Sequence, residues 1–128
     1  MRWLFDTNIL IDAFAGRSDA VEAITNARSS DLEWVGYSAI TRLEALGFPE
    51  LNAADEVGLR QLLAQFSEAP ISAAIIERAI EIRRSIRIKA PDALIAATAL
   101  IYGASLVTRN SRDFTAVPEL AIINPASL

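Results

Sequence analysis

The chain has 128 residues, 52% of them hydrophobic, and a net charge of −4 at pH 7, which suits a single domain with a buried core. It contains no cysteine and no histidine, which excludes disulfides and thiolate chemistry, and its acidic balance argues against a protein that coats nucleic acid. The longest uncharged stretch, residues 93–108, is interrupted by Gly103 and is shorter than the about 20 apolar residues of a membrane span. Met1 leads directly into an apolar run without the pattern of a signal peptide, so we expect a cytoplasmic protein that contacts no membrane.

Strand-like and helix-like segments alternate along the chain. In order, we predict a strand at 2–5, helices at 7–14 and 19–28, a strand at 32–36, helices at 39–46 and 52–66, a short strand at 70–71, helices at 73–86 and 92–102, and strands at 105–108 and 120–123. This alternation is typical of βαβ units. We therefore predict that residues 1–128 form one α/β domain, a three-layer α/β/α sandwich with a mainly parallel sheet of about five strands.

Several residues at the predicted helix ends fit known capping preferences. Ser18, Ser38 and Ser72 each precede a predicted helix and are candidate N-caps. Pro91 suits the first turn of the helix that follows it, and Gly103 suits the position just beyond the end of that helix. These residues mark where the predicted helices begin and end.

Four acidic residues, Asp6, Glu44, Asp92 and Asp113, stand where a parallel sheet could gather them. Asp6 ends the first strand, which places it at the sheet edge where ligands bind in open α/β folds, although it also suits a helix N-cap. Asp92 opens a helix that is otherwise apolar, so we expect it at the rim of a pocket. Taken alone, Glu44 fits a boundary residue that reaches solvent and Asp113 fits an ordinary turn aspartate.

Four carboxylates gathered in one crevice would repel one another and raise each other's pKa values. A divalent cation removes that penalty, and an all-oxygen ligand set favours Mg²⁺ or Mn²⁺ over zinc. One or two such ions can activate water and stabilise charge on a phosphoryl group. The acidic residues, taken together, therefore indicate metal-dependent phosphoryl chemistry.

Basic side chains are concentrated in residues 78–112, which carry seven basic and two acidic residues, whereas residues 1–77 carry five basic and twelve acidic residues. One interpretation is a solvated helix face, since Glu81 and Arg84 are spaced to pair on one helix. The other is a rim that attracts phosphate beside the acidic pocket, and the charge pattern alone favours the first. The candidate substrate-binding residues are Arg84, Arg87, Lys89, Arg109 and Arg112.

Four segments, taken in order, resemble the motifs of PIN-domain ribonucleases, especially the VapC-like toxins of toxin–antitoxin pairs. They are Asp6–Asn8, Ser38–Glu44, Pro91–Ala99 and Thr108–Phe114. Each segment is common by itself, but the four in this order are specific. The resemblance covers essentially the whole chain at the usual size of the family.

This resemblance implies a magnesium-dependent endoribonuclease in which metal-bound water attacks an RNA phosphodiester in line. The groups that would ligate metal or orient water are Asp6, Glu44, Asp92 and Asp113. The groups that would support them are Asn8, Thr41, Thr108 and Asn110. The resemblance also implies a homodimer and a cognate antitoxin that lies over the groove. The overall acidic charge departs from the expected pattern and assigns substrate contact to residues 78–112.

Three alternatives remain at the level of the sequence. A haloacid-dehalogenase-like phosphatase also begins with an aspartate after its first strand, but it requires a second acid two residues later, where this chain has Asn8. A receiver-like signalling domain requires paired acids near the first strand, whereas Asp31 and Glu33 precede the second. A non-catalytic PIN-like scaffold could retain the four acids for stability.

Overall fold

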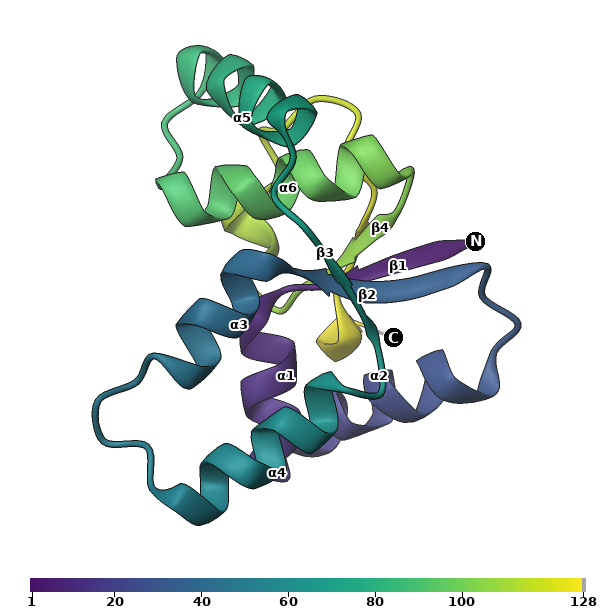
Figure 1. Ribbon diagram of the computed structural model, residues 1–128. Helices are drawn as coiled ribbons and strands as arrows, with labels where there is room; N and C mark the ends of the chain where they lie inside the picture. The colour runs from purple at the N-terminus through teal and green to yellow at the C-terminus, as the bar shows by residue number, and fades with distance from the viewer. Residues whose placement is uncertain (128) are drawn as a thin grey trace.

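One parallel sheet with the strand order β3-β2-β1-β4-β5 forms the centre of the protein (Figure 1). The computed structural model describes residues 1–127. Its strands are β1 (Arg2–Phe5), β2 (Trp34–Ser38), β3 (Ser67–Ala69), β4 (Ser105–Val107) and β5 (Ile122–Ile123). The chain extends the sheet from β1 to β3 on one side and then crosses to add β4 and β5 on the other. In open α/β sheets, ligands bind at the carboxyl ends of the strands where the order reverses, which here is between β1 and β4.

Helices cover both faces of this sheet, which confirms the predicted three-layer α/β/α sandwich. Within residues 1–127 the α-helices are α1 (Thr7–Phe14), α2 (Ser18–Ser29), α3 (Ala39–Leu46), α4 (Ala53–Leu63), α5 (Ala73–Ser85) and α6 (Ala90–Tyr102). Figure 1 shows α5 and α6 above the sheet, with α1, α2 and α4 below it. Helix α3 begins where β2 ends and contacts α1, α4 and α6. Among these described helices, none has the length and apolar character needed to cross a membrane.

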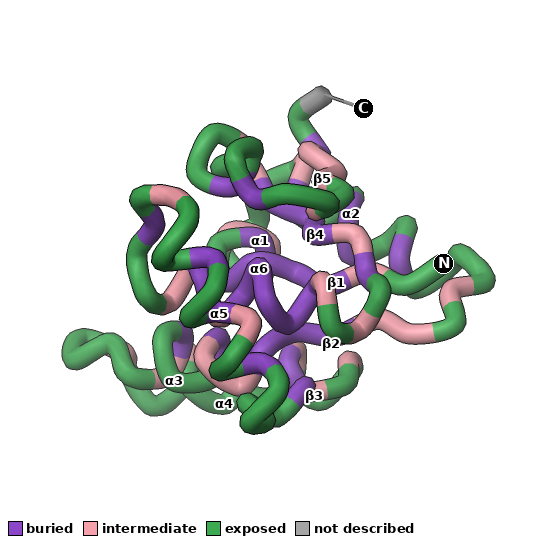
Figure 2. Tube along the Cα trace, turned by 90° about the horizontal axis from the view of Figure 1, so that it is seen from above, coloured by how far each residue is buried: buried purple, intermediate pink, exposed green. Residues whose placement is uncertain are grey.

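The hydrophobic core consists of two layers, one on each face of the sheet. Leu4 and Leu106 belong to the layer between the sheet and helices α5 and α6. Phe5 and Val107 belong to the layer between the sheet and helices α1 and α2. Successive strand residues point to opposite faces, so a parallel strand that is buried on both sides needs a continuous apolar run. Figure 2 shows the buried residues gathered in α6 and the central strands.

The six predicted helices are present in the described residues, and their ends lie within three residues of the predicted ones. The hydroxyl of Ser38 accepts a hydrogen bond from the backbone N–H of Ile40, and that of Ser72 accepts one from Ile75, each at 3.2 Å. Gly103 follows α6 with φ of 61°, a left-handed conformation that glycine adopts at little cost. The prediction for Ser18 is wrong, because Ser18 is the first residue of α2 and follows Arg17, whose side chain makes no capping bond.

Two strands lie at other positions than predicted, and the strands predicted at 105–108 and 120–123 are shorter, covering Ser105–Val107 and Ile122–Ile123. The second strand covers residues 34–38 instead of 32–36, since it runs directly into the N-cap of α3. The third covers Ser67–Ala69 instead of 70–71. Pro70 lacks an N–H group and ends the strand, and the preceding Ser67 and Glu68 are polar because β3 lies at the sheet edge.

Candidate functional site

A pocket of about 420 Å³ at the carboxyl ends of β1 and β4 is lined by all four predicted acidic residues. Asp6 directly follows β1, and Glu44 belongs to α3. Asp92 lies in the first turn of α6, and Asp113 ends the 3₁₀ turn after β4. The fold therefore brings together, in one acidic pocket, carboxylates that lie far apart along the chain.

Asp6 is held in place through both of its carboxylate oxygens. Its Oδ1 accepts a hydrogen bond of 2.8 Å from the backbone N–H of Thr7, and its Oδ2 accepts one of 2.8 Å from the hydroxyl of Thr108. The Thr108 hydroxyl in turn accepts a hydrogen bond from the backbone N–H of Asn110 at 3.0 Å. Since Asp6 and Thr108 are buried, this chain of bonds gives the Asp6 carboxylate a defined orientation.

Glu44 is held by a hydroxyl that the sequence did not point to. The Thr7 hydroxyl donates to Glu44 Oε1 at 2.8 Å and lies 2.9 Å from the hydroxyl of Thr41. Thr7 and Thr41 are buried, whereas Glu44 is exposed. The only sequence signal for Thr7 was its place directly after Asp6, because its burial and its bond to Glu44 arise from the fold.

Burial and the negative charge of the pocket raise the pKa values of two of its acids. Burial raises the pKa of Asp6 to about 6, the hydrogen bonds from Thr108 and Thr7 partly oppose the rise, and the charges of Asp92 and Glu44 add to it. The pKa of Asp92 is also raised, first by burial and then by Asp113 and Glu44. The carboxylates therefore destabilise one another's charged forms.

The donor set of the acidic pocket suits a hard cation, because all four side chains offer oxygen atoms. Burial and, to a smaller extent, repulsion among the carboxylates raise the pKa values of Asp6 and Asp92, and a cation bound among them would stabilise their charged forms. However, in the part of the chain that the structure describes, no three side chains of a metal-binding type are grouped so that they could hold an ion. The four acids share one pocket, as expected from the sequence, without converging at coordinating distance.

The predicted supporting residues lie around this pocket. Asn8 and Asn110 are exposed and line it. Thr108 and Thr41 lie beneath it in the core, where Thr108 contacts Asp6 and Thr41 contacts Thr7. The structure thus places all four near the acidic residues, two at the surface of the pocket and two below it.

A second cavity, of about 510 Å³, adjoins the acidic pocket. Three of the predicted substrate-binding residues, Arg87, Lys89 and Arg112, line this basic cavity. Lys89, Asp92 and Asp113 line both spaces, so the two are adjacent. A fourth cation that lines it, Arg83, was not among the predicted residues, although Arg83 lies in the same basic segment.

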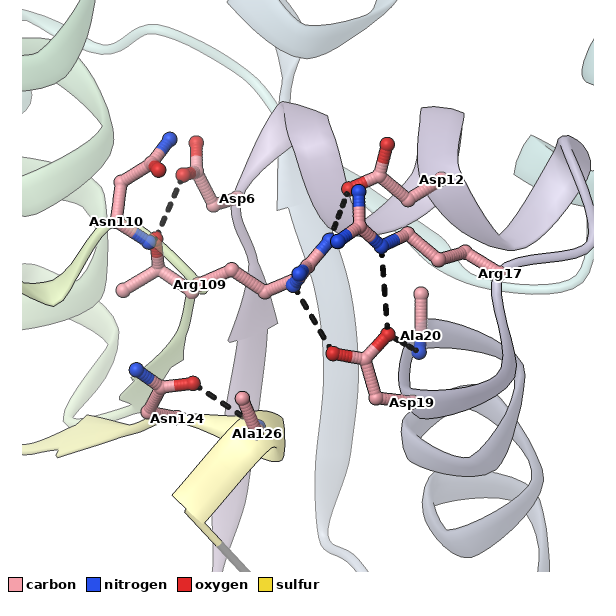
Figure 3. Close-up of polar contacts among 10 residues, drawn as sticks. Asp6, Asp12, Arg17, Asp19, Ala20, Arg109, Asn110, Asn124 and Ala126 are labelled. Atoms are coloured by element: carbon pink, nitrogen blue, oxygen red, sulfur yellow. Dashed lines mark hydrogen bonds and ion pairs between the residues drawn. The ribbon is translucent and has the colours of Figure 1, made fainter.

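The other two predicted substrate-binding residues lie outside both spaces. Arg84 is exposed in the last turn of α5. Arg109 points away from Asp6 toward Asp12 and Asp19, as Figure 3 shows. Its Nη1 donates to Asp12 Oδ2 at 3.1 Å, and its Nε lies 3.0 Å from Asp19 Oδ2. The structure therefore assigns its guanidinium to an ion pair inside the fold.

The fold and the site define this protein as a parallel α/β domain with an acidic pocket at the switch point of its sheet. The family model of the PIN domain matches residues 3–120 of this chain. The chain therefore belongs to the PIN-domain family. No match to it is found among curated proteins.

Solved structures resemble the protein over nearly its whole length. A chain of a toxin–antitoxin complex from Klebsiella pneumoniae is 36% identical, with a TM-score of 0.79 over 95% of this chain and 96% of that one. A chain of FitAcB from Neisseria gonorrhoeae is 28% identical, with a TM-score of 0.78 over 98% and 99%. A chain of VapBC2 from Rickettsia felis, solved with a DNA fragment from its promoter, has 22% identity and a TM-score of 0.82 over 97% and 98%. These matches confirm the resemblance to VapC-like PIN domains.

Proposed function

We propose that this protein is a Mg²⁺- or Mn²⁺-dependent endoribonuclease and the toxin of a toxin–antitoxin pair. The observation that carries the proposal is that Asp6, Glu44, Asp92 and Asp113 line one pocket that adjoins a basic cavity. An acidic pocket alone suits a cation, and a basic cavity alone suits a polyanion. The two side by side suit a cation that acts on a phosphodiester of a nucleic acid bound next to it.

The groups that would hold the ion are the carboxylates of the acidic pocket. When bound, the ion would activate water and stabilise the negative charge of the phosphoryl group in transfer. Thr7 and Thr108 orient Asp6 for this role, and Thr7 also orients Glu44. Such outer hydrogen bonds fix the direction in which a ligand presents its oxygen atoms.

The basic cavity would bind the RNA backbone. The cationic groups of Arg87, Lys89 and Arg112 line it, and their exposed side chains are free to contact phosphate oxygens. Arg84 lies nearby on α5 and would add to the attraction over a longer range. Phosphate contacts of this kind position a nucleic acid without reading its sequence.

The partners in this proposal are a cognate antitoxin and a second copy of the chain. Support for the antitoxin comes from the 36% identical chain in the Klebsiella pneumoniae toxin–antitoxin complex. Leu43, Phe48 and Val57 on and between α3 and α4 are more than half exposed, and a partner that covered them would remove apolar surface from water. Ile76 and Ile80, exposed on α5, would serve the same purpose in a homodimer.

The direct test is a cleavage assay on a set of unpaired and structured RNAs. We expect cleavage with Mg²⁺ or Mn²⁺, no cleavage after treatment with EDTA, and recovery when the cation is restored in excess. A wild-type protein that folds, binds the cation and cleaves none of these RNAs would indicate a non-catalytic PIN-like scaffold.

Removal of two cations that line the basic cavity, Arg87 and Lys89, and of Arg84 outside it is expected to weaken RNA binding. In the variant Arg84→Ala, Arg87→Ala and Lys89→Ala, the dependence of log K on log[salt] should flatten by about 0.7 for each phosphate that the protein no longer neutralises. Binding is measured by fluorescence anisotropy in EDTA, so that cleavage does not interfere.

The matched control removes three arginines outside the basic cavity, Arg17, Arg28 and Arg60. The control variant loses the same net charge and should bind RNA more weakly only through the general field of the protein. Equal salt slopes for the two variants would support the other interpretation of residues 78–112, a solvated helix face that does not bind RNA.

A further inference from the structure

Arg109 is the centre of an ion-pair cluster that joins three parts of the fold. Its guanidinium contacts Asp12 in α1 and Asp19 in α2, and it follows Thr108 directly in the loop after β4 (Figure 3). The side chain of Arg109 is only 20% exposed, and those of Asp12 and Asp19 are 27% and 25% exposed. Ion pairs that are this far removed from water are screened less than pairs at the open surface.

The placement of the two acids shows that the cluster has a specific geometry. Asp19 lies in the first turn of α2, where the helix dipole favours a negative charge. Asp12 lies near the end of α1, where the helix dipole disfavours a negative charge, so a nearby cation stabilises its carboxylate. Arginine suits this position because its permanently charged, planar group donates to Asp12 and lies within ion-pair distance of Asp19 at the same time.

The cluster lies next to the hydrogen bonds that orient Asp6. Thr108 and Asn110 are the residues before and after Arg109 in the chain. The Thr108 hydroxyl donates to Asp6, and the backbone N–H of Asn110 donates to the Thr108 hydroxyl. Asp6 caps the short helix α1, and Asp12 belongs to it. The ion pair between Arg109 and Asp12 therefore ties the helix that starts at Asp6 to the loop that supports Asp6.

From this arrangement we propose that Arg109 is a positioning residue, which acts on the candidate active site through Thr108 and Asn110 and not by contact with RNA. This inference rests on the proposed nuclease function for its kinetic consequences. Its structural consequence, a defined loop after β4, holds whether or not the protein cleaves RNA.

The test is Arg109→Met, which removes the charge and keeps the aliphatic part of the side chain. We expect kcat to fall by about 10–100-fold, the usual effect of losing a group that orients a ligand, with KM changed by less than about threefold. In the metal-free protein, we expect the amide of Asn110 to exchange its hydrogen about tenfold faster, because its acceptor is no longer held in place.

The matched control is Arg17→Met. Arg17 approaches the same carboxylate of Asp19 from the outside, at 3.8 Å, and is 56% exposed. Its removal should leave kcat, KM and the exchange of Asn110 unchanged. If Arg109→Met does not fold, adding Asp12→Asn and Asp19→Asn removes the uncompensated charges, and the same lowered kcat and faster exchange are expected.

The outcomes separate the two proposals. A raised KM and a flatter salt dependence with unchanged kcat would overturn the positioning role in favour of direct contact with RNA. Wild-type kinetics and wild-type exchange at Asn110 would overturn it outright. If the wild-type protein cleaves no RNA, the nuclease proposal fails, and the exchange rate at Asn110 alone still decides whether Arg109 positions the loop.

Discussion

Asp6→Asn and Asp92→Asn are each expected to abolish RNA cleavage without unfolding the protein. Both residues line the acidic pocket, and asparagine has nearly the same shape as aspartate but lacks its negative charge. Loss of a proposed ligand should cost more than the about 10–100-fold typical of an outer hydrogen-bond partner. The measurement is the initial rate of cleavage at saturating Mg²⁺, together with thermal unfolding of each variant.

Asp31→Asn is the matched control, because Asp31 is exposed and outside the acidic pocket. The control should cleave RNA at the wild-type rate. Without metal, the Asp6 and Asp92 variants should be as stable as the wild-type protein or slightly more stable, since each relieves repulsion. Full activity in either variant would remove that residue from the proposed site.

The metal-free protein is expected to lose stability as the pH rises from about 4 to about 6. The pKa of the Asp6 carboxyl is 3.8 in the unfolded reference and about 6 in the folded protein. The folded state therefore binds this proton more tightly, its full contribution is present below pH 3.8, and ionisation above that value favours unfolding. The loss is complete above about pH 6 and amounts to roughly 3 kcal/mol. Asp92, whose pKa is also raised, acts in the same direction.

Urea unfolding of wild-type protein and Asp6→Asn across this pH range isolates the effect, because other titrating groups are common to both. The difference in the free energy of unfolding should grow in favour of the variant as the pH rises and then become constant. Saturating Mg²⁺ at pH 7 should stabilise the wild-type protein more than the variant. Parallel pH curves would show that Asp6 titrates normally in the folded state.

The fold was largely predictable because its signals are local. Strands buried on both faces are short apolar runs, such as Trp3-Leu4-Phe5, and serines cap two of the helices. The errors occurred where local signals are weak. Strand β3 lies at the sheet edge and carries polar side chains, so its pairing with β2 left no apolar pattern to detect.

The candidate site was predictable in its members but not in its arrangement. The sequence and the family resemblance pointed to four acids, and all four line one pocket. Nothing local distinguished Arg109 from the other cations of residues 78–112, because its partners Asp12 and Asp19 lie about ninety residues away in the chain. Distance along the chain also concealed the hydrogen bond between Thr7 and Glu44.

The sequence by itself determined the alternation of strands and helices, the absence of sulfur and imidazole ligands, and the acid at the end of β1. These properties depend on residue type and short-range periodicity, which can be read without knowing what lies nearby. The tertiary structure decided which side chains meet, because strand order places the ends of β1 and β4 side by side. Burial then raised the pKa of Asp6, and pairing with Asp12 and Asp19 turned Arg109 away from the pocket.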